Sequence, residues 1–248
     1  MSSPLDQFKI ETKVPLEIGG INASITNSSL WMFAIVIALT AFFLIAMRRR
    51  EMVPGRAQSV AEMLYEFIGN MIRDNVGHGG RPYFPFIFSL FMFILGANYA
   101  GMLPYSFTVT SHIAVTFTFA AIVFMGVVVI GFAKHGLHFL SMFLPSGTPI
   151  YLAPLIIIIE LISFLSRPVT LSVRLFANMT AGHILLKVFA GFIISMGAAG
   201  GAISALAVLP FVMNIALSAL EFLVAGVQAY VFALLTCIYL NDAVNLHH

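Results

Sequence analysis

Charged residues are scarce in this sequence of 248 residues. Asp, Glu, Lys and Arg make up 9% of it, whereas 60% of the residues are hydrophobic. About a quarter of the residues in a soluble domain are charged, so this composition excludes a soluble globular enzyme and a disordered tail. The net charge of +2 provides no strongly basic face for nucleic acid. The single cysteine excludes a disulfide framework and a multi-cysteine metal site.

Motifs of common cofactor and catalytic sites are also missing. The sequence contains no glycine-rich phosphate loop and no His-Glu-x-x-His zinc motif. We therefore expect neither a cofactor nor a metal ion, and an oxidoreductase or intramembrane protease is weakly supported. The long apolar runs instead predict an integral membrane protein, in which each ionisable residue within a span is a candidate for function.

The apolar runs predict an all-α fold with about five membrane-crossing helices. Residues 30–47, 84–103 and 113–133 each have about the 20 residues that one crossing needs. Two runs are longer, 150–196 and 203–240, and at 1.5 Å per residue they would extend about 70 Å and about 57 Å. A turn at Arg167-Pro168 would leave backbone groups unpaired in lipid. We therefore expect two long, strongly tilted helices that form a hairpin around Gly197–Gly201.

A further segment, 57–74, is predicted to be an amphipathic helix at the membrane interface, because apolar residues occupy one of its faces and charged residues the other. The chain then divides into an outer-side arm (1–29), a region with three spans and the interfacial helix (30–149), and the hairpin (150–248). Segments 48–82 and 134–149 hold seven Lys and Arg, whereas the arm holds two. This asymmetry places the N-terminus outside and the C-terminus in the cytoplasm.

Charged residues within the two long runs are the candidates for chemistry. They are Glu160, Arg167, Arg174, Lys187 and Glu221. Arginine does not release its proton on burial, so Arg174 needs an anion or water nearby. At 100° per residue, Glu160, Arg167 and Asn178 lie within about 40° of it, which predicts one polar stripe. The alternatives are a structural ion pair of Arg174 with Glu160 or Glu221, and a solvated interface position for Arg167.

A second polar group faces in another direction. His183 lies about 180° from Arg174, so the two cannot face one site on a straight helix. Asn214, Glu221 and Gln228 recur every seven residues on the next helix, which places them on one stripe facing either the preceding helix or water. The amides alternatively serve only to hold helices together.

These two groups differ in what they do with a proton. Imidazole and carboxylate groups exchange protons near neutral pH when their surroundings tune them, whereas a guanidinium does not relay protons. The residues therefore predict a proton path of two halves that are separated by a fixed positive charge.

The segment Ser166–His183, SRPVTLSVRLFANMTAGH, resembles the signature of the subunit a family of ATP synthase, the membrane stator of the rotary enzyme. Pro104–His112 resembles the outer loop of that family. Glu221–Gln228, together with Ile238–Leu240, resembles its final helix. The resemblance covers most of residues 25–242. Its histidine-then-glutamate order, at positions 183 and 221, is similar to the mitochondrial form and indicates an alphaproteobacterial or mitochondrion-like source.

The resemblance implies a role for each candidate residue. Arg174 is the stator arginine that faces the proton-carrying carboxylate of a rotating c-ring. The outer-side proton path comprises His183, Glu221, Asn178 and Gln228, to which the seven-residue stripe adds Asn214. The inner-side path comprises Glu160 and Ser163.

The resemblance also implies the surroundings of the chain. Its partners are the c-ring subunits, b-type subunits of the peripheral stalk, lipid and, indirectly, the catalytic head that makes ATP. The location is a bacterial inner membrane, with the N-terminus periplasmic. A stand-alone ion channel or transporter is the alternative, but it would need its own substrate pocket and usually inverted repeats. His247 and His248 are either native or the remnant of a tag.

Overall fold

The computed structural model describes residues 12–15, 17–18, 21–22, 24–48, 51–103, 106–143 and 151–245. This part of the chain contains five helices that are long and apolar enough to cross a membrane. They are α1 (Asn27–Ala46), α3 (Phe84–Gly101), α4 (Ile113–His135), α5 (Ala153–Ala199) and α7 (Val208–Val244). The predicted all-α membrane fold is therefore confirmed. Predictions that concern Pro104, Tyr105, His247 and His248 lie outside the described residues.

Four very short strands precede α1, and the sequence did not predict them. β1 (Thr12–Val14) pairs antiparallel with β4 (Ile25–Thr26), and β2 (Glu17–Ile18) pairs antiparallel with β3 (Ile21–Asn22). Thr26 then caps α1, because its side chain accepts from the backbone N–H of Ser29. Strands of two or three residues leave the fold class unchanged.

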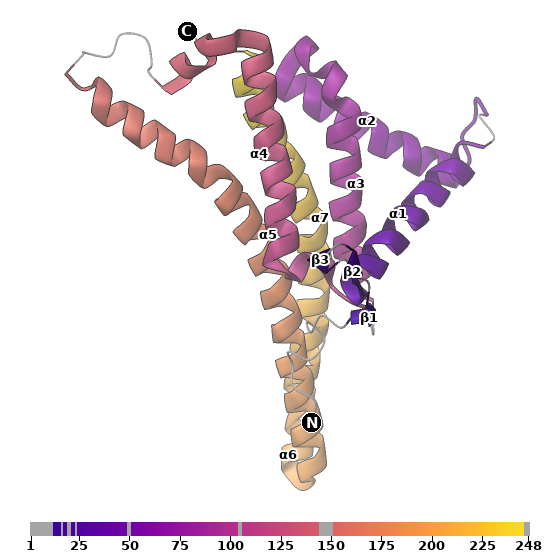
Figure 1. Cartoon of the computed structure of the whole chain (residues 1–248). Helices are drawn as coiled ribbons and strands as arrows, with labels where there is room; N and C mark the ends of the chain where they lie inside the picture. The colour runs from indigo at the N-terminus through magenta and orange to yellow at the C-terminus, as the bar shows by residue number, and fades with distance from the viewer. Residues whose placement is uncertain are drawn as a thin grey trace.

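The predicted interfacial helix is α2 (Arg56–Val76), which crosses the end of the bundle where α1 finishes and α3 begins (Figure 1). Its buried residues include Ile68, Met71 and Ile72, whereas Arg73 and Asp74 are exposed. Gly77 ends the helix with a φ of 75°, a conformation that glycine adopts without steric cost. The 3₁₀ helix η2 (Gly77–Tyr83) follows and leads into α3.

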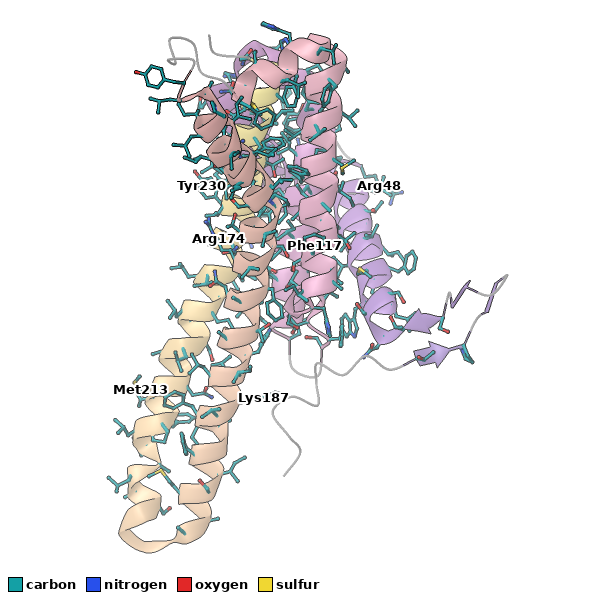
Figure 2. The ribbon with its side chains drawn as sticks, turned by 60° about the vertical axis from the view of Figure 1, so that its left-hand side comes forward. Arg48, Phe117, Arg174, Lys187, Met213 and Tyr230 are labelled. Atoms are coloured by element: carbon teal, nitrogen blue, oxygen red, sulfur yellow. The ribbon has the colours of Figure 1, made fainter. Side chains whose placement is uncertain are left out.

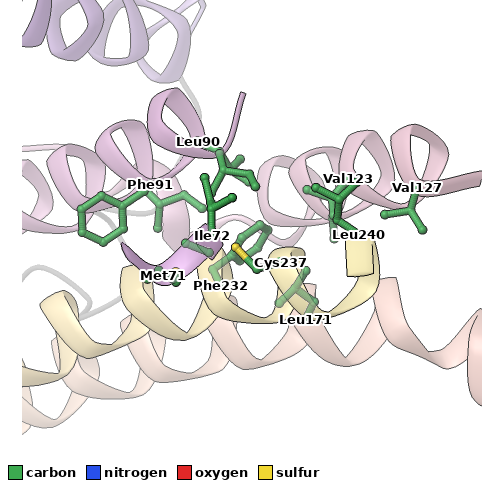
Figure 3. Close-up of a cluster of buried hydrophobic side chains, with 14 of the residues drawn as sticks. Met71, Ile72, Leu90, Phe91, Val123, Val127, Leu171, Phe232, Cys237 and Leu240 are labelled. Atoms are coloured by element: carbon green, nitrogen blue, oxygen red, sulfur yellow. The ribbon is translucent and has the colours of Figure 1, made fainter. Parts of the chain in front are cut away.

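The core lies where α2, α3, α4, α5 and α7 meet (Figure 3). Its buried side chains include Met71, Ile72, Leu90, Phe91, Val123, Leu171, Phe232, Cys237 and Leu240. The outward faces of the same helices carry exposed large apolar residues, such as Phe86, Met125 and Leu223. Because lipid tails are as apolar as these side chains, close packing and polar contacts hold the helices together more than burial does.

α5 and α7 lie side by side and extend beyond α1, α3 and α4 at one end (Figures 1 and 2). α5 continues through Pro168 as one helix of 47 residues. Gly200 and the short helix α6 (Gly201–Leu206) connect it to α7. Gly200 and Gly201 have φ values of 70° and 60°, which favour glycine at this turn. The steep tilt of the pair within a membrane remains a prediction.

Candidate functional site

Polar side-chain contacts join α5 to α7 within residues 151–245. Asn178 Nδ2 donates to Gln228 Oε1 at 2.8 Å, His183 Nδ1 lies 3.1 Å from Glu221 Oε1, and Arg167 donates to Asp242 Oδ2 at 2.7 Å. The residue numbers rise on α5 as they fall on α7, so the two helices are antiparallel. Two of these contacts join residues for which the sequence predicts a single path.

The His183–Glu221 contact is buried. The two residues are 8% and 6% exposed, and the second imidazole nitrogen, Nε2, lies 3.0 Å from Thr108 Oγ1. Gly182 makes room for this arrangement, since a Cβ at that position would lie 2.8 Å from Glu221 Oε1. The structure thus places an imidazole nitrogen within 3.1 Å of a carboxylate oxygen, although neither oxygen of Glu221 has a hydrogen-bond partner among the described residues.

The amide residues of the predicted outer path occupy different places. Gln228 is buried against Asn178, and its Nε2 has no hydrogen-bond partner among the described residues. Asn214 is half-buried, and its Oδ1 likewise lacks a partner in the described part of the chain. Glu221 and Gln228 both contact α5, so this part of the seven-residue stripe faces the preceding helix.

Arg174 is exposed on α5 and lies on the side turned away from α1, whose end carries Arg48 (Figure 2). No carboxylate within 151–245 or the other described ranges forms an ion pair with it. Glu221 lies against His183, and Glu160 is 14 residues away, or about 21 Å along the helix at 1.5 Å per residue. A structural ion pair of Arg174 is therefore not observed.

The predicted inner-side residues lie on the first part of α5, which diverges from α7 in Figure 1. Glu160 is half-buried, whereas Ser163 is exposed and its carbonyl accepts a hydrogen bond from Ser166. No contact among the described residues brings either of them to Arg174 or His183. The inner-side and outer-side candidates therefore form two separate groups.

Arg167 has a partner that the sequence did not reveal. Besides the bond to Asp242, its guanidinium carbon lies 4.9 Å from the ring centre of Tyr239 and 5.4 Å from that of Phe164. The side chains of Arg167 and Asp242 are 20% and 32% exposed. Arg167 thus connects the first third of α5 to the C-terminal end of α7 and is more than a solvated interface residue.

We expect the Arg167–Asp242 pair to contribute about 1 kcal/mol of coupling energy, because a partly exposed ion pair is worth about that or less. A double-mutant cycle with Arg167→Ala and Asp242→Asn, measured by thermal unfolding in detergent, gives this energy. The exchanged pair, Arg167→Asp with Asp242→Arg, should recover part of the stability. A coupling energy of zero would show that the contact is incidental.

Sequence reasoning also missed polar contacts that bring other helices to α5 and α7. Thr116 on α4 lies 3.3 Å from Ser172 on α5, and Asn98 on α3 donates to the carbonyl of Ala225 at 3.0 Å. Thr108, in the segment between α3 and α4, contacts His183. The only sequence signal for Thr108 is its place in the predicted outer loop.

Comparison with known proteins shows the family to which the chain is similar. The family model described as ATP synthase A chain matches residues 29–241. ATP synthase subunit a of Rhodospirillum rubrum is 57% identical over 247 residues, which is 100% of both chains. That of Agrobacterium fabrum is 58% identical over 100% of this chain and 99% of its own, and that of Parvibaculum lavamentivorans is 57% identical over 99% and 94%.

The aligned regions span 99–100% of this chain, and the family model spans the segment that holds the candidate residues from Glu160 to Gln228. Several come from alphaproteobacteria, which agrees with the form that the sequence resembles. The chain therefore belongs to the ATP synthase A chain family and is an integral membrane subunit of the proton-translocating ATP synthase complex.

Proposed function

We propose that this chain forms two offset aqueous half-channels that carry protons to and from the carboxylates of a rotating c-ring. The observation that supports the proposal best is the division of α5 into two faces. One face carries the buried contact of His183 with Glu221, and another carries the exposed Arg174, which has no carboxylate partner among the residues described. A proton-exchanging pair and a fixed cation on separate faces suit a path that is interrupted at the cation.

The outer half-channel begins at the His183–Glu221 pair. A proton from the outer side passes between imidazole and carboxylate, whose facing atoms lie 3.1 Å apart. The amides of Asn178, Gln228 and Asn214 continue the polar lining, and the unpartnered Nε2 of Gln228 offers a donor to water or to a ring carboxylate. A ring carboxylate that takes up the proton becomes neutral and can face lipid at much lower cost.

Arg174 acts at the point where the ring carboxylate is charged. After nearly a full rotation the carboxyl group releases its proton into the inner half-channel near Glu160 and Ser163. The resulting anion is stabilised beside the guanidinium, which always carries a charge and so repels a proton that would leak straight across. Each proton that crosses contributes about 2.3 kcal/mol per 100 mV of membrane potential, and rotation delivers this energy to the distant catalytic head.

The proposal also includes the subunits that contact this chain and its orientation in the membrane. The exposed face of α5 around Arg174 contacts the c-ring, and α2 contacts b-type subunits of the peripheral stalk. The N-terminus lies in the periplasm and the C-terminus in the cytoplasm of a bacterial inner membrane. The chain carries out no step of ATP chemistry itself. Membership of a family whose members are subunits of a complex argues against a stand-alone channel or transporter.

Replacement of Arg174 in the assembled complex tests this function. Proton-driven ATP synthesis is measured in membrane vesicles, and near-normal synthesis would overturn the proposal.

Replacing Gly182 with alanine should lower proton-driven ATP synthesis about tenfold to a hundredfold. The new Cβ would lie 2.8 Å from Glu221 Oε1, so the carboxylate must move, and a shift of about 1 Å at a reacting group costs up to about a hundredfold. Alanine is the better helix former, so weakening of α5 would not explain a loss. Gly126→Ala is the control, because nothing lies within 4 Å of its Cβ position. Equal rates in the two variants would contradict the assigned geometry.

A further inference from the structure

Thr108 is buried between two polar atoms from different helices. Its Oγ1 lies 3.0 Å from His183 Nε2 on α5 and 3.3 Å from the carbonyl oxygen of Gly101 at the end of α3. The residue is 2% exposed. It precedes η3 (Val109–Ser111), in the segment that joins α3 to α4. The hydroxyl therefore connects this segment to the imidazole that contacts Glu221.

Neighbouring residues fix Thr108 in this place. A Cβ on Gly101 would lie 2.7 Å from Thr108 Cγ2, so only glycine permits the approach. Ser111 Oγ donates to the carbonyl of Thr108 at 2.6 Å, and Thr180 on α5 donates to the carbonyl of Ser111 at 3.4 Å. The segment is thus tied to both α3 and α5, one turn of helix from His183.

The hydrogens available at these atoms permit two arrangements. In the first, the Thr108 hydroxyl donates to the Gly101 carbonyl and accepts the Nε2 hydrogen of His183. If the imidazole is then neutral, its Nδ1 has no hydrogen and faces a protonated carboxyl group of Glu221. If it is an imidazolium, Nδ1 also carries a hydrogen and faces Glu221 with it. In the second, the hydroxyl donates to Nε2, so the neutral imidazole carries its hydrogen on Nδ1, beside a carboxylate. A hydroxyl supports both arrangements because it is a donor and an acceptor.

We infer that Thr108 is a positioning residue for His183. By bonding Nε2 in each protonation state, it keeps the ring turned so that Nδ1 faces Glu221 while the proton changes place. Lys187, one turn further along α5, is a further charged group that acts on the imidazole. This role rests on the proposed proton transfer between His183 and Glu221, and it adds a residue from outside the paired helices to that step.

Replacing Thr108 with valine tests the inference, since valine has nearly the same shape and no hydroxyl. We expect proton-driven ATP synthesis in vesicles to fall about tenfold, because a buried imidazole nitrogen loses its hydrogen-bond partner, and we expect its pH profile to be displaced. Thr108→Ser retains the hydroxyl and should restore both the rate and the profile. Thr116→Val is the matched control, because Thr116 is also buried and bonds to α5 through Ser172 instead of His183.

A Thr108→Val complex with the unaltered rate and pH profile would overturn the inference. If that variant does not assemble, Thr108→Ala provides the measurement, because alanine also has no hydrogen-bonding group in its side chain. An unaltered profile in that variant would also overturn the inference. The proposed function is tested separately by removing His183 and Glu221. Loss of flux in that variant, with an unaltered Thr108→Val complex, would refute the positioning role alone.

Discussion

Proton-driven ATP synthesis should fall about a hundredfold when Arg174 is replaced with alanine. A charged side chain in the middle of a membrane costs about 2.5–3.5 kcal/mol, and the ring carboxylate would meet this cost without a guanidinium beside it. Each 1.36 kcal/mol changes a rate tenfold, which gives the expected factor. Arg174 is exposed and pairs with no carboxylate in the described ranges, so its removal leaves no buried partner of this chain uncompensated. Vesicles that contain the assembled complex provide the measurement.

A second variant at position 174 separates the charge of the arginine from its shape, and a variant elsewhere serves as the control. Arg174→Lys keeps a positive charge but lacks the planar fork that binds a carboxylate through two hydrogen bonds, so we expect an intermediate rate. Lys134→Ala removes an exposed cation in the last turn of α4 and should leave synthesis unchanged. The alanine variant at position 174 should also dissipate a proton gradient faster, because the barrier to a direct leak is gone. Synthesis at more than half the normal rate would rule out the stator role.

Replacing His183 with alanine together with Glu221→Gln should reduce proton flux at least about a hundredfold while the complex still assembles. A positioned acid–base group contributes about a hundredfold to ten-thousandfold to a proton-transfer step, and this variant removes both partners of the contact at 3.1 Å. Removing both also avoids an unpartnered charge in a buried site, which would destabilise the fold. Proton uptake by vesicles reports the flux, and the amount of complex in the membrane reports assembly.

The single variants show whether His183 and Glu221 act as one unit. If a proton must pass both, either single change should cost nearly as much as the double change, which is the pattern of groups that act together. Ser218→Ala is the control on α7, because Ser218 is exposed and its hydroxyl bonds to the carbonyl of Asn214 in its own helix. Unchanged flux in the double variant would remove both residues from the outer path.

The membrane-crossing helices were predictable because the hydrophobicity and length of a segment indicate them, and α2 was predictable from the period of its apolar residues. The boundaries of α2 and α4 lie within a few residues of those expected from the sequence, and α5 continues through Pro168 as predicted. A helical wheel also separates Arg174 from His183, since 3.6 residues per turn is a local property of one helix. These conclusions need no knowledge of which helix packs against which.

Contacts between elements were harder to predict, because a sequence gives no register between two helices. The seven-residue stripe on α7 left open whether Glu221 faced α5 or water, and only the packing of the two helices decides this. Arg167 and Asp242 are 75 residues apart, and neither has a neighbour that suggests the other. Thr108 stands in a polar connection in which hydroxyl residues are common, so nothing in its surroundings singles it out.

The antiparallel contacts between α5 and α7 have a consequence for changes in chain length. Each residue added to or removed from a helix rotates everything beyond it by 100°. A deletion between positions 167 and 178 would therefore prevent the contact with Asp242 from forming together with those to Gln228 and Glu221. The turn at Gly200–Ala207 is exposed over much of its length and carries none of the three. Variation in length among such chains should therefore accumulate at this turn, while the helical segments that it joins keep a fixed number of residues.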